Sequence, residues 1–173
     1  MTIKKDNLIL IIMCGIPCSG KTTWIKKNIY SLYEKYNLPI IIISKDDIRE
    51  ANFFMPKYKY DTKSEEYVTK LFYKQLSNAT TLLSQAVIII DNTHIKPSRI
   101  DTYLSIFKTM IDNGNMKLYI KFFDIPLWRA KIRNIFRRYK TGKSISKDIF
   151  KKAYANYKNI NKAKYSSYLY PKK

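Results

Sequence analysis

The chain has 173 residues, about the length of one ordinary domain, which excludes a large multidomain enzyme. Hydrophobic residues make up 46% of the sequence, enough for a packed core, so an intrinsically disordered protein is excluded too. The net charge of +20 favours polyanionic partners such as nucleic acid. Residues 121–173 carry 16 of the 33 basic side chains but only 2 of the 13 acidic ones. A coding bias toward Lys accounts for part of this positive excess.

The first predicted element is a strand at residues 8–14, a continuous apolar run typical of a strand buried on both faces of a parallel sheet. This run is much shorter than the roughly 20 residues that span a membrane, and no cleavage site follows it. We therefore expect a cytoplasmic protein that is not attached to a membrane. Similar runs at residues 39–44 and 86–91 predict two more buried strands, and an alternating run at 117–124 predicts a fourth strand nearer the sheet edge.

Helical patterns separate and follow these strands. Apolar spacing, capping residues and a first-turn proline predict helices at residues 21–36, 62–85, 97–111, 127–139 and 146–159. This alternation predicts one α/β domain over residues 1–173, with a parallel β-sheet of four or five strands and helices on both faces. Residues 151–173 form a basic segment rich in Lys and Tyr, and we expect its last part, residues 162–173, to be only partly ordered.

A phosphate-binding loop follows the first strand. The sequence GIPCSGKT at residues 15–22 fits the P-loop pattern G-x-x-x-x-G-K-[ST], with a strand before it and a helix after it. Backbone N–H groups of such a loop surround phosphates, Lys21 would bridge the outer phosphates, and the Thr22 hydroxyl would bind Mg²⁺. The fold is therefore predicted to be of the P-loop NTPase type. We predict an ATP site formed by Gly15, Ser19, Gly20, Lys21, Thr22 and Thr23.

The second group of polar residues, SKDDIR, lies at the carboxyl end of the second strand, at residues 44–49. Ligands of open α/β sheets bind at this edge, so these side chains share it with the P-loop. Asp46 could accept a proton from an attacking hydroxyl, and Arg49 could hold an anion of the acceptor. Aspartates are also favoured at the start of a helix, and the residues alone leave both interpretations open.

Asp91 ends the third predicted strand, where an aspartate commonly supports a metal ion or its waters; capping of the next helix is the alternative. Cys14, Cys18 and His94 are the only cysteines and histidine, too few soft ligands for a structural zinc site. We expect His94 to form hydrogen bonds within its loop rather than to act in catalysis.

The predicted helix at residues 127–139 carries Arg129, Arg133 and Arg137 at helical spacing, hence on one face. Such a face beside a nucleotide suggests a helical lid, residues 127–145, that closes on the transferred phosphoryl group. A solvated basic face is the competing interpretation. The apolar residues expected to face the body are Ile132, Ile135 and Phe136.

Together these motifs resemble the kinase half of bacteriophage-type polynucleotide 5′-kinases, over about residues 9–150. The segments that carry the resemblance are GIPCSGKTTW, SKDDIR, IIIDNTHIKPSR and FFDIPLWRAKIRNIFRR. The resemblance implies that Lys21 and Thr22 bind ATP and Mg²⁺, that Asp46 is the general base on the 5′-hydroxyl, and that Arg49 contacts the substrate phosphate. It further implies an active-site role for Asp91, lid contacts to nucleotide phosphates by Arg133 and Arg137, and acceptor contacts near Asn92 and Thr93, where the family has Thr then Asn. A looser match joins residues 55–70 to the family's linker into the third helix.

The activity implied by this resemblance is transfer of the γ-phosphate of ATP to 5′-hydroxyl ends of DNA or RNA, as in end healing. Its expected partners are ATP and single-stranded or end-exposed nucleic acid. The D-x-D-x-T motif of the bifunctional relatives is missing from the sequence, so we expect no 3′-phosphatase activity, which leaves room for a separate phosphatase or ligase as a partner.

Two other functions remain open at this point. A P-loop phosphotransferase acting on a small molecule or nucleotide sugar would share the loop and the base but would gain little from the high positive charge. A nucleic-acid-binding module with a regulatory NTP site is a second alternative, against which the intact Lys21, Thr22, Asp46 and Arg49 argue.

Overall fold

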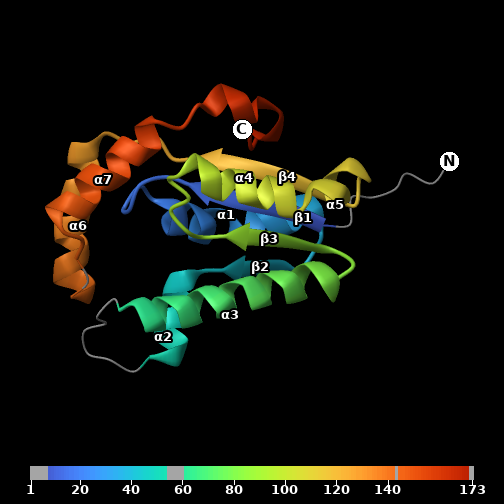
Figure 1. Ribbon diagram of the computed structural model, residues 1–173, viewed down its shortest axis with the longest axis horizontal. Helices are drawn as coiled ribbons and strands as arrows, with labels where there is room; N and C mark the ends of the chain where they lie inside the picture. Colours follow the sequence, from blue (N-terminus) through green and yellow to red (C-terminus); the bar gives the residue numbers. More distant parts are fainter. Residues whose placement is uncertain (1–7, 54–60, 143, 172–173) are drawn as a thin grey trace.

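The computed structural model describes residues 8–53, 61–142 and 144–171. In this part of the chain, four strands form one parallel sheet in the order β2-β3-β1-β4 (Figure 1). The strands are β1 (Leu8–Cys14), β2 (Ile40–Ile43), β3 (Ala86–Ile90) and β4 (Met116–Phe122). The predicted α/β fold with a parallel sheet is thereby confirmed.

Seven α-helices and one 3₁₀ helix occur in the described residues. They are α1 (Lys21–Tyr36), α2 (Lys45–Asn52), α3 (Thr62–Thr81), α4 (Pro97–Ile106), α5 (Lys108–Asp112), α6 (Leu127–Thr141), α7 (Lys147–Lys158) and η1 (Lys162–Tyr168). The single helix predicted at residues 97–111 is wrong, because the chain leaves helical geometry at the buried Phe107, with φ −99° and ψ 8°. The third helix ends four residues earlier than predicted, at Thr81, and α2 was not assigned as a helix from the sequence.

The core lies on both faces of the sheet, because the side chains of a strand alternate between its faces. Leu10 and Ile12 of β1 belong to the cluster that contains the buried residues of α3 and α4. Ile9 and Ile11 belong to the opposite cluster, with Ile25 of α1. Figure 1 shows α1 behind the sheet and α4 in front of it. Helices therefore cover both faces, as the sequence predicted.

One of the two edge strands of the sheet was not predicted as an edge. The all-isoleucine strand β2 was expected to be buried on both faces, yet it is an edge strand and Ile42 is 40% exposed. A run of isoleucines does not distinguish a central strand from an edge strand when helices cover only part of it. Strand β4 is the other edge, as predicted.

The C-terminal segment, residues 160–171, is packed against the body, which corrects the expectation of partial order. Tyr165 is 1% exposed and belongs to the main core cluster. The Tyr170 N–H donates to the Ile120 carbonyl of β4 at 3.0 Å. Residues 172 and 173, and residues 55–60 of the predicted linker, lie outside the described residues. None of the described helices is both long and apolar enough to cross a membrane.

Candidate active site

The P-loop connects the carboxyl end of β1 to the N-terminus of α1, as its sequence requires. Gly20 caps α1 with φ 103°, a conformation that L side chains rarely adopt. At residue 15 a glycine is needed because there is no room for a side chain. A Cβ there would lie 2.7 Å from the Ser19 hydroxyl oxygen and 2.9 Å from the Cβ of Phe123. The Gly15 N–H donates to the Thr93 carbonyl at 2.9 Å, which ties the loop to the segment after β3.

Lys21 is buried at the base of this loop. Its Nζ donates to the carbonyls of Gly15 at 3.1 Å and Ile16 at 3.0 Å. Burial lowers the pKa of Lys21, and the carboxylates of Asp91 and Asp46 act in the opposite direction. The ammonium group is therefore fixed inside the loop, with both candidate acidic residues close enough to act on it.

Thr22 of α1 lies beside Asp91, the residue that follows β3. The Thr22 hydroxyl donates to Asp91 Oδ2 at 2.6 Å, and burial raises the pKa of Asp91. The alternative role of Asp91 as a helix cap has no support, because α4 begins after Lys96. A hydroxyl and a carboxylate fit Mg²⁺, which binds few protein oxygens together with phosphates and water. Bound there, the ion would neutralise charge on the phosphates.

Asp46 and Arg49 lie on α2, and the capping of this helix is done by another residue. The Ser44 hydroxyl accepts from the N–H groups of Asp46 and Asp47 at 3.2 and 3.3 Å. The Asp46 carboxylate is therefore available for another role; its side chain is 61% exposed and its Oδ1 accepts from Arg49 at 2.5 Å. Ser44 rather than Asp46 is therefore the N-cap of α2, while Asp46 and Asp47 both lie in its first turn, where aspartates also stabilise a helix.

The Arg49 guanidinium is held by Glu65 of α3, a residue that the sequence did not single out. Its Nε and Nη2 donate to Glu65 Oε1 and Oε2 at 2.7 and 2.8 Å. Sixteen residues separate the two, and only the packing of α2 against α3 brings them together. Arg49 thus orients Asp46 while being oriented by Glu65.

The residues after Asp91 join neighbouring elements. The Asn92 side chain accepts from the Lys45 N–H at 3.2 Å, so it fixes the start of α2. His94 is buried with φ 42°, its Nδ1 lies 2.9 Å from the Met13 carbonyl, and its Nε2 lies 3.1 Å from the Tyr103 hydroxyl. Because a carbonyl only accepts, Nδ1 carries the proton and Nε2 accepts from Tyr103. Burial lowers the pKa of His94 to about 4, so the neutral ring forms hydrogen bonds as expected, but to β1 and α4 rather than within its own loop.

Helix α6 reaches the P-loop through Arg133. Its Nη1 donates to the carbonyls of Ser19 at 3.0 Å and Cys18 at 3.3 Å. Arg137 lies one turn further along and is half-buried, whereas Thr23 of α1 is exposed. The expectation that the apolar side chains of this helix face the body is wrong, because Ile132, Ile135 and Phe136 are all exposed. The side toward the body is formed by Leu127, Ala130 and Asn134.

Comparison with solved structures shows the same fold in several proteins. A chain of the Pnkp1/Rnl/Hen1 RNA repair complex matches with a TM-score of 0.71 and 20% identity, over 91% of this chain and 46% of that one. Kti12 from Chaetomium thermophilum, solved in complex with ADP-AlF3, matches with a TM-score of 0.64 and 14% identity, over 94% of this chain and 86% of Kti12. The chain thus spans less than half of the repair protein that it resembles.

A family model for the AAA domain matches residues 10–160, which is most of the chain. The matched range includes the P-loop, α2, β3 with the following Asp91, and α6. The chain therefore belongs to the AAA domain family and has a fold of the P-loop NTPase type.

Proposed function

We propose that the protein is an ATP-dependent polynucleotide 5′-hydroxyl kinase. The observation that carries this proposal is the position of Asp46, an exposed carboxylate fixed by Arg49 at the edge of the P-loop site. The negative charge of Asp46 acts to raise the pKa of Lys21 and of Asp91, as the smallest of the named causes on each, so Asp46 acts electrostatically on the residues that would hold the phosphates and Mg²⁺. A general base is needed in that position.

The reaction follows from these contacts. The P-loop and Lys21 would bind the β- and γ-phosphates, with Thr22 and Asp91 as ligands for Mg²⁺. Asp46 would take the proton of the 5′-hydroxyl as its oxygen attacks the γ-phosphorus, and the bond to the β-phosphate oxygen would break to release ADP. Arg133 and Arg137 would stabilise charge on the leaving phosphates.

A polynucleotide acceptor is favoured over a small molecule by the charge of the chain. The net charge is +20, and helix α6, next to the P-loop, carries six basic and no acidic side chains. A field of this kind attracts a polyanion and adds little to the binding of a neutral sugar or nucleoside. A protein of similar fold belongs to an RNA repair complex, which makes nucleic-acid ends the first acceptors to test.

The direct test is transfer from labelled ATP to 5′-hydroxyl DNA and RNA oligomers, beside a free nucleoside. We expect phosphorylation of the oligomers at their 5′ ends. Asp46→Asn should lower the rate by roughly 10²- to 10⁴-fold with ATP binding retained, because the side chain keeps its shape and loses its basicity. Asp47→Asn, one residue along the same helix, is the matched control and should transfer normally.

Two results would overturn the proposal. Phosphorylation of the free nucleoside alone would identify a small-molecule kinase. Nucleotide binding without transfer to any acceptor would favour a binding module with a regulatory NTP site.

A further inference from the structure

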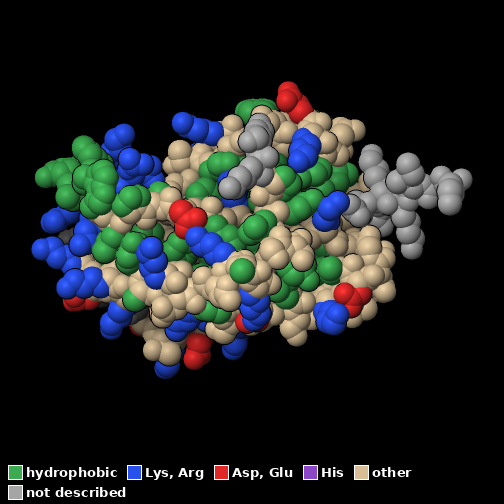
Figure 2. All heavy atoms as spheres, turned by 90° about the horizontal axis from the view of Figure 1, so that it is seen from above, with side chains coloured by type: hydrophobic (Ala, Val, Ile, Leu, Met, Phe, Trp, Pro, Cys, Tyr) green, Lys and Arg blue, Asp and Glu red, His purple; other side chains and the backbone are tan. Residues whose placement is uncertain are grey.

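A groove of about 790 Å³ lies between α6 and α7, and the P-loop is not part of its lining. Figure 2 shows basic and exposed hydrophobic side chains gathered at the end of the molecule formed by these two helices. The residues that line the groove are Lys131, Asn134, Ile135, Arg138, Tyr139, Ser144, Ile145, Ser146, Lys147 and Phe150.

All the charged residues that line this groove are basic. It contains the cations Lys131, Arg138 and Lys147, and none of the residues that line it is acidic. Tyr139 adds an aromatic ring that is 83% exposed, the most exposed large hydrophobic side chain in the described part of the chain. Three cations beside a free aromatic face suit a ligand with phosphates and planar rings.

The walls of the groove are fixed. The Asn134 side chain donates to the Ile145 carbonyl at 2.9 Å and accepts from the Ile145 N–H at 3.0 Å, which ties α6 to the link before α7. Phe150 is buried in the core and anchors α7. The cations are thus carried on a preformed surface, which lowers the entropy cost of binding.

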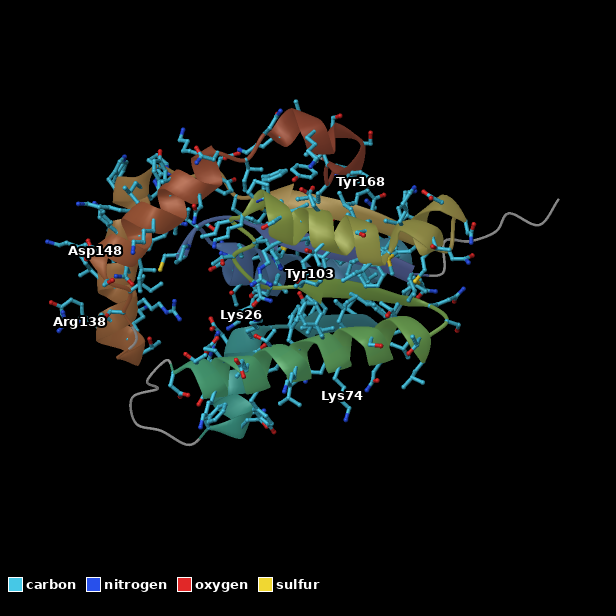
Figure 3. All side chains as sticks on the ribbon, in the orientation of Figure 1. Lys26, Lys74, Tyr103, Arg138, Asp148 and Tyr168 are labelled. Atoms are coloured by element: carbon cyan, nitrogen blue, oxygen red, sulfur yellow. The ribbon has the colours of Figure 1, made fainter. Side chains whose placement is uncertain are left out.

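The cations of this groove lie off the face of α6 that meets the P-loop, although Asn134 of the lining also approaches the P-loop, with its Oδ1 4.0 Å from Cys18 Sγ. Arg133 reaches the P-loop carbonyls, whereas Arg138 lies five residues on, about 140° around the helix. Figure 3 shows Arg138 pointing outward from α6, away from the sheet. A ligand in the groove would therefore lie behind the lid helix rather than over the nucleotide.

We propose that this groove binds a single-stranded segment of nucleic acid, with phosphates on Lys131, Arg138 and Lys147 and a base stacked on Tyr139. The proposal rests on the proposed function for its context, since the bound segment would lie several nucleotides from the end that is phosphorylated. A single strand is favoured over a duplex because only unpaired bases offer a free face to an aromatic ring. The groove then sets affinity for long acceptors and leaves the chemical step unchanged.

The charge part of the proposal is tested by binding of a long single-stranded oligothymidylate without ATP. The triple variant Lys131→Gln, Arg138→Gln, Lys147→Gln should bind about 10-fold more weakly or worse, and its log–log salt slope should be shallower by about 2, from about 0.7 per phosphate contact on a single strand. A control triple variant loses the same charge from α1 and α3 and should change neither quantity. Its substitutions are Lys27→Gln, Lys35→Gln and Lys74→Gln, at exposed sites.

The stacking part is tested at Tyr139. Tyr139→Ala should weaken oligothymidylate binding roughly 10-fold, and Tyr139→Phe should retain it, because the ring rather than the hydroxyl makes the contact. Tyr30→Ala on α1 is the matched control, since Tyr30 is 81% exposed and lies outside the groove. Equal losses at both tyrosines would overturn the stacking role.

The failure of this proposal can be told apart from failure of the kinase assignment. If the triple variant loses oligothymidylate affinity but the protein phosphorylates no 5′ ends, the proposal for the groove is supported and the proposed kinase activity is wrong. If ends are phosphorylated and the triple variant binds normally, the groove proposal fails alone. Polyglutamate displacing the oligonucleotide at equal charge concentration would also overturn it, because that result identifies a site for acidic protein segments.

Discussion

Glu65 orders the candidate base through Arg49. Two hydrogen bonds fix the plane of the Arg49 guanidinium, and the third contact, to Asp46, follows from that plane. Neither bond could be expected from the sequence, because Glu65 lies on another helix. Residues of the P-loop were predictable for the opposite reason: they are consecutive, and their spacing alone determines their geometry.

Glu65→Gln should therefore lower kcat for transfer to a 5′-hydroxyl oligomer by roughly 10- to 100-fold, the usual cost of losing a charged hydrogen bond. The KM for ATP should change little, because Glu65 contacts Arg49 and not the P-loop. Steady-state kinetics with each substrate varied in turn separates the two constants. Glu66→Gln, the exposed neighbour on α3, is the control. A matching loss of kcat in that variant would show a general charge effect instead.

His94 couples protonation to folding. The unfolded side chain takes up a proton near pH 6.5, whereas the buried ring does so only near pH 4. The contribution of His94 to the free energy of unfolding is therefore fully present above pH 6.5 and is lost as the pH falls toward 4. Its slope is up to about 1.4 kcal/mol per pH unit, and its total is about 3 kcal/mol. Urea unfolding at a series of pH values measures this slope. His94→Asn should lower stability at pH 7 and flatten the dependence between pH 6.5 and 4.5; an unchanged slope would mean that other groups cause it.

At the scale of elements, α6 shows what a helical pattern can and cannot predict. Its length and its arginine face were predicted from spacing, and Arg133 does contact the P-loop. Which face packs inward was predicted wrongly, because the inner side is formed by the small Ala130 and the polar Asn134 rather than by the largest apolar residues. Hydrophobic spacing identifies a helix more reliably than it identifies the helix's partner.

Arg137 tests whether this helix acts as a lid. Arg137→Ala should lower kcat by about 10³-fold or more with a dinucleotide acceptor, if its guanidinium meets charge that develops during transfer. Arg137→Lys should restore little, because an ammonium cannot reproduce the planar fork. Arg138 lies off that face, so Arg138→Ala should leave kcat unchanged with the dinucleotide, which is too short to extend to the groove. Equal losses at both positions, or none at either, would identify a merely basic surface.

At the scale of the whole molecule, the strand–helix alternation was enough to predict the sheet and its two covered faces. It was not enough to predict how the edge strand β4 is protected. The C-terminal segment does this by passing around that edge: Leu169 pairs with Ile120 of β4, Tyr165 enters one core cluster, and Tyr170 packs on Trp24 of α1 in the other. A Lys- and Tyr-rich composition gives no sign of such packing, since the same residues are common in disordered tails.

Tyr165 should therefore contribute to stability rather than to nucleic-acid binding. The ring is 1% exposed and its hydroxyl donates to Asp101 at 3.0 Å, so Tyr165→Ala leaves a cavity and removes one hydrogen bond from Asp101, which keeps its contact with Lys164. We expect the free energy of unfolding to fall by about 3–5 kcal/mol, against about 1 kcal/mol for Tyr165→Phe, which removes only the hydroxyl. Lys164→Ala removes an exposed ion pair with the same aspartate and should change stability little. Urea unfolding ranks the three variants. A small loss for Tyr165→Ala, together with weaker oligonucleotide binding, would instead identify this segment as a nucleic-acid-binding tail.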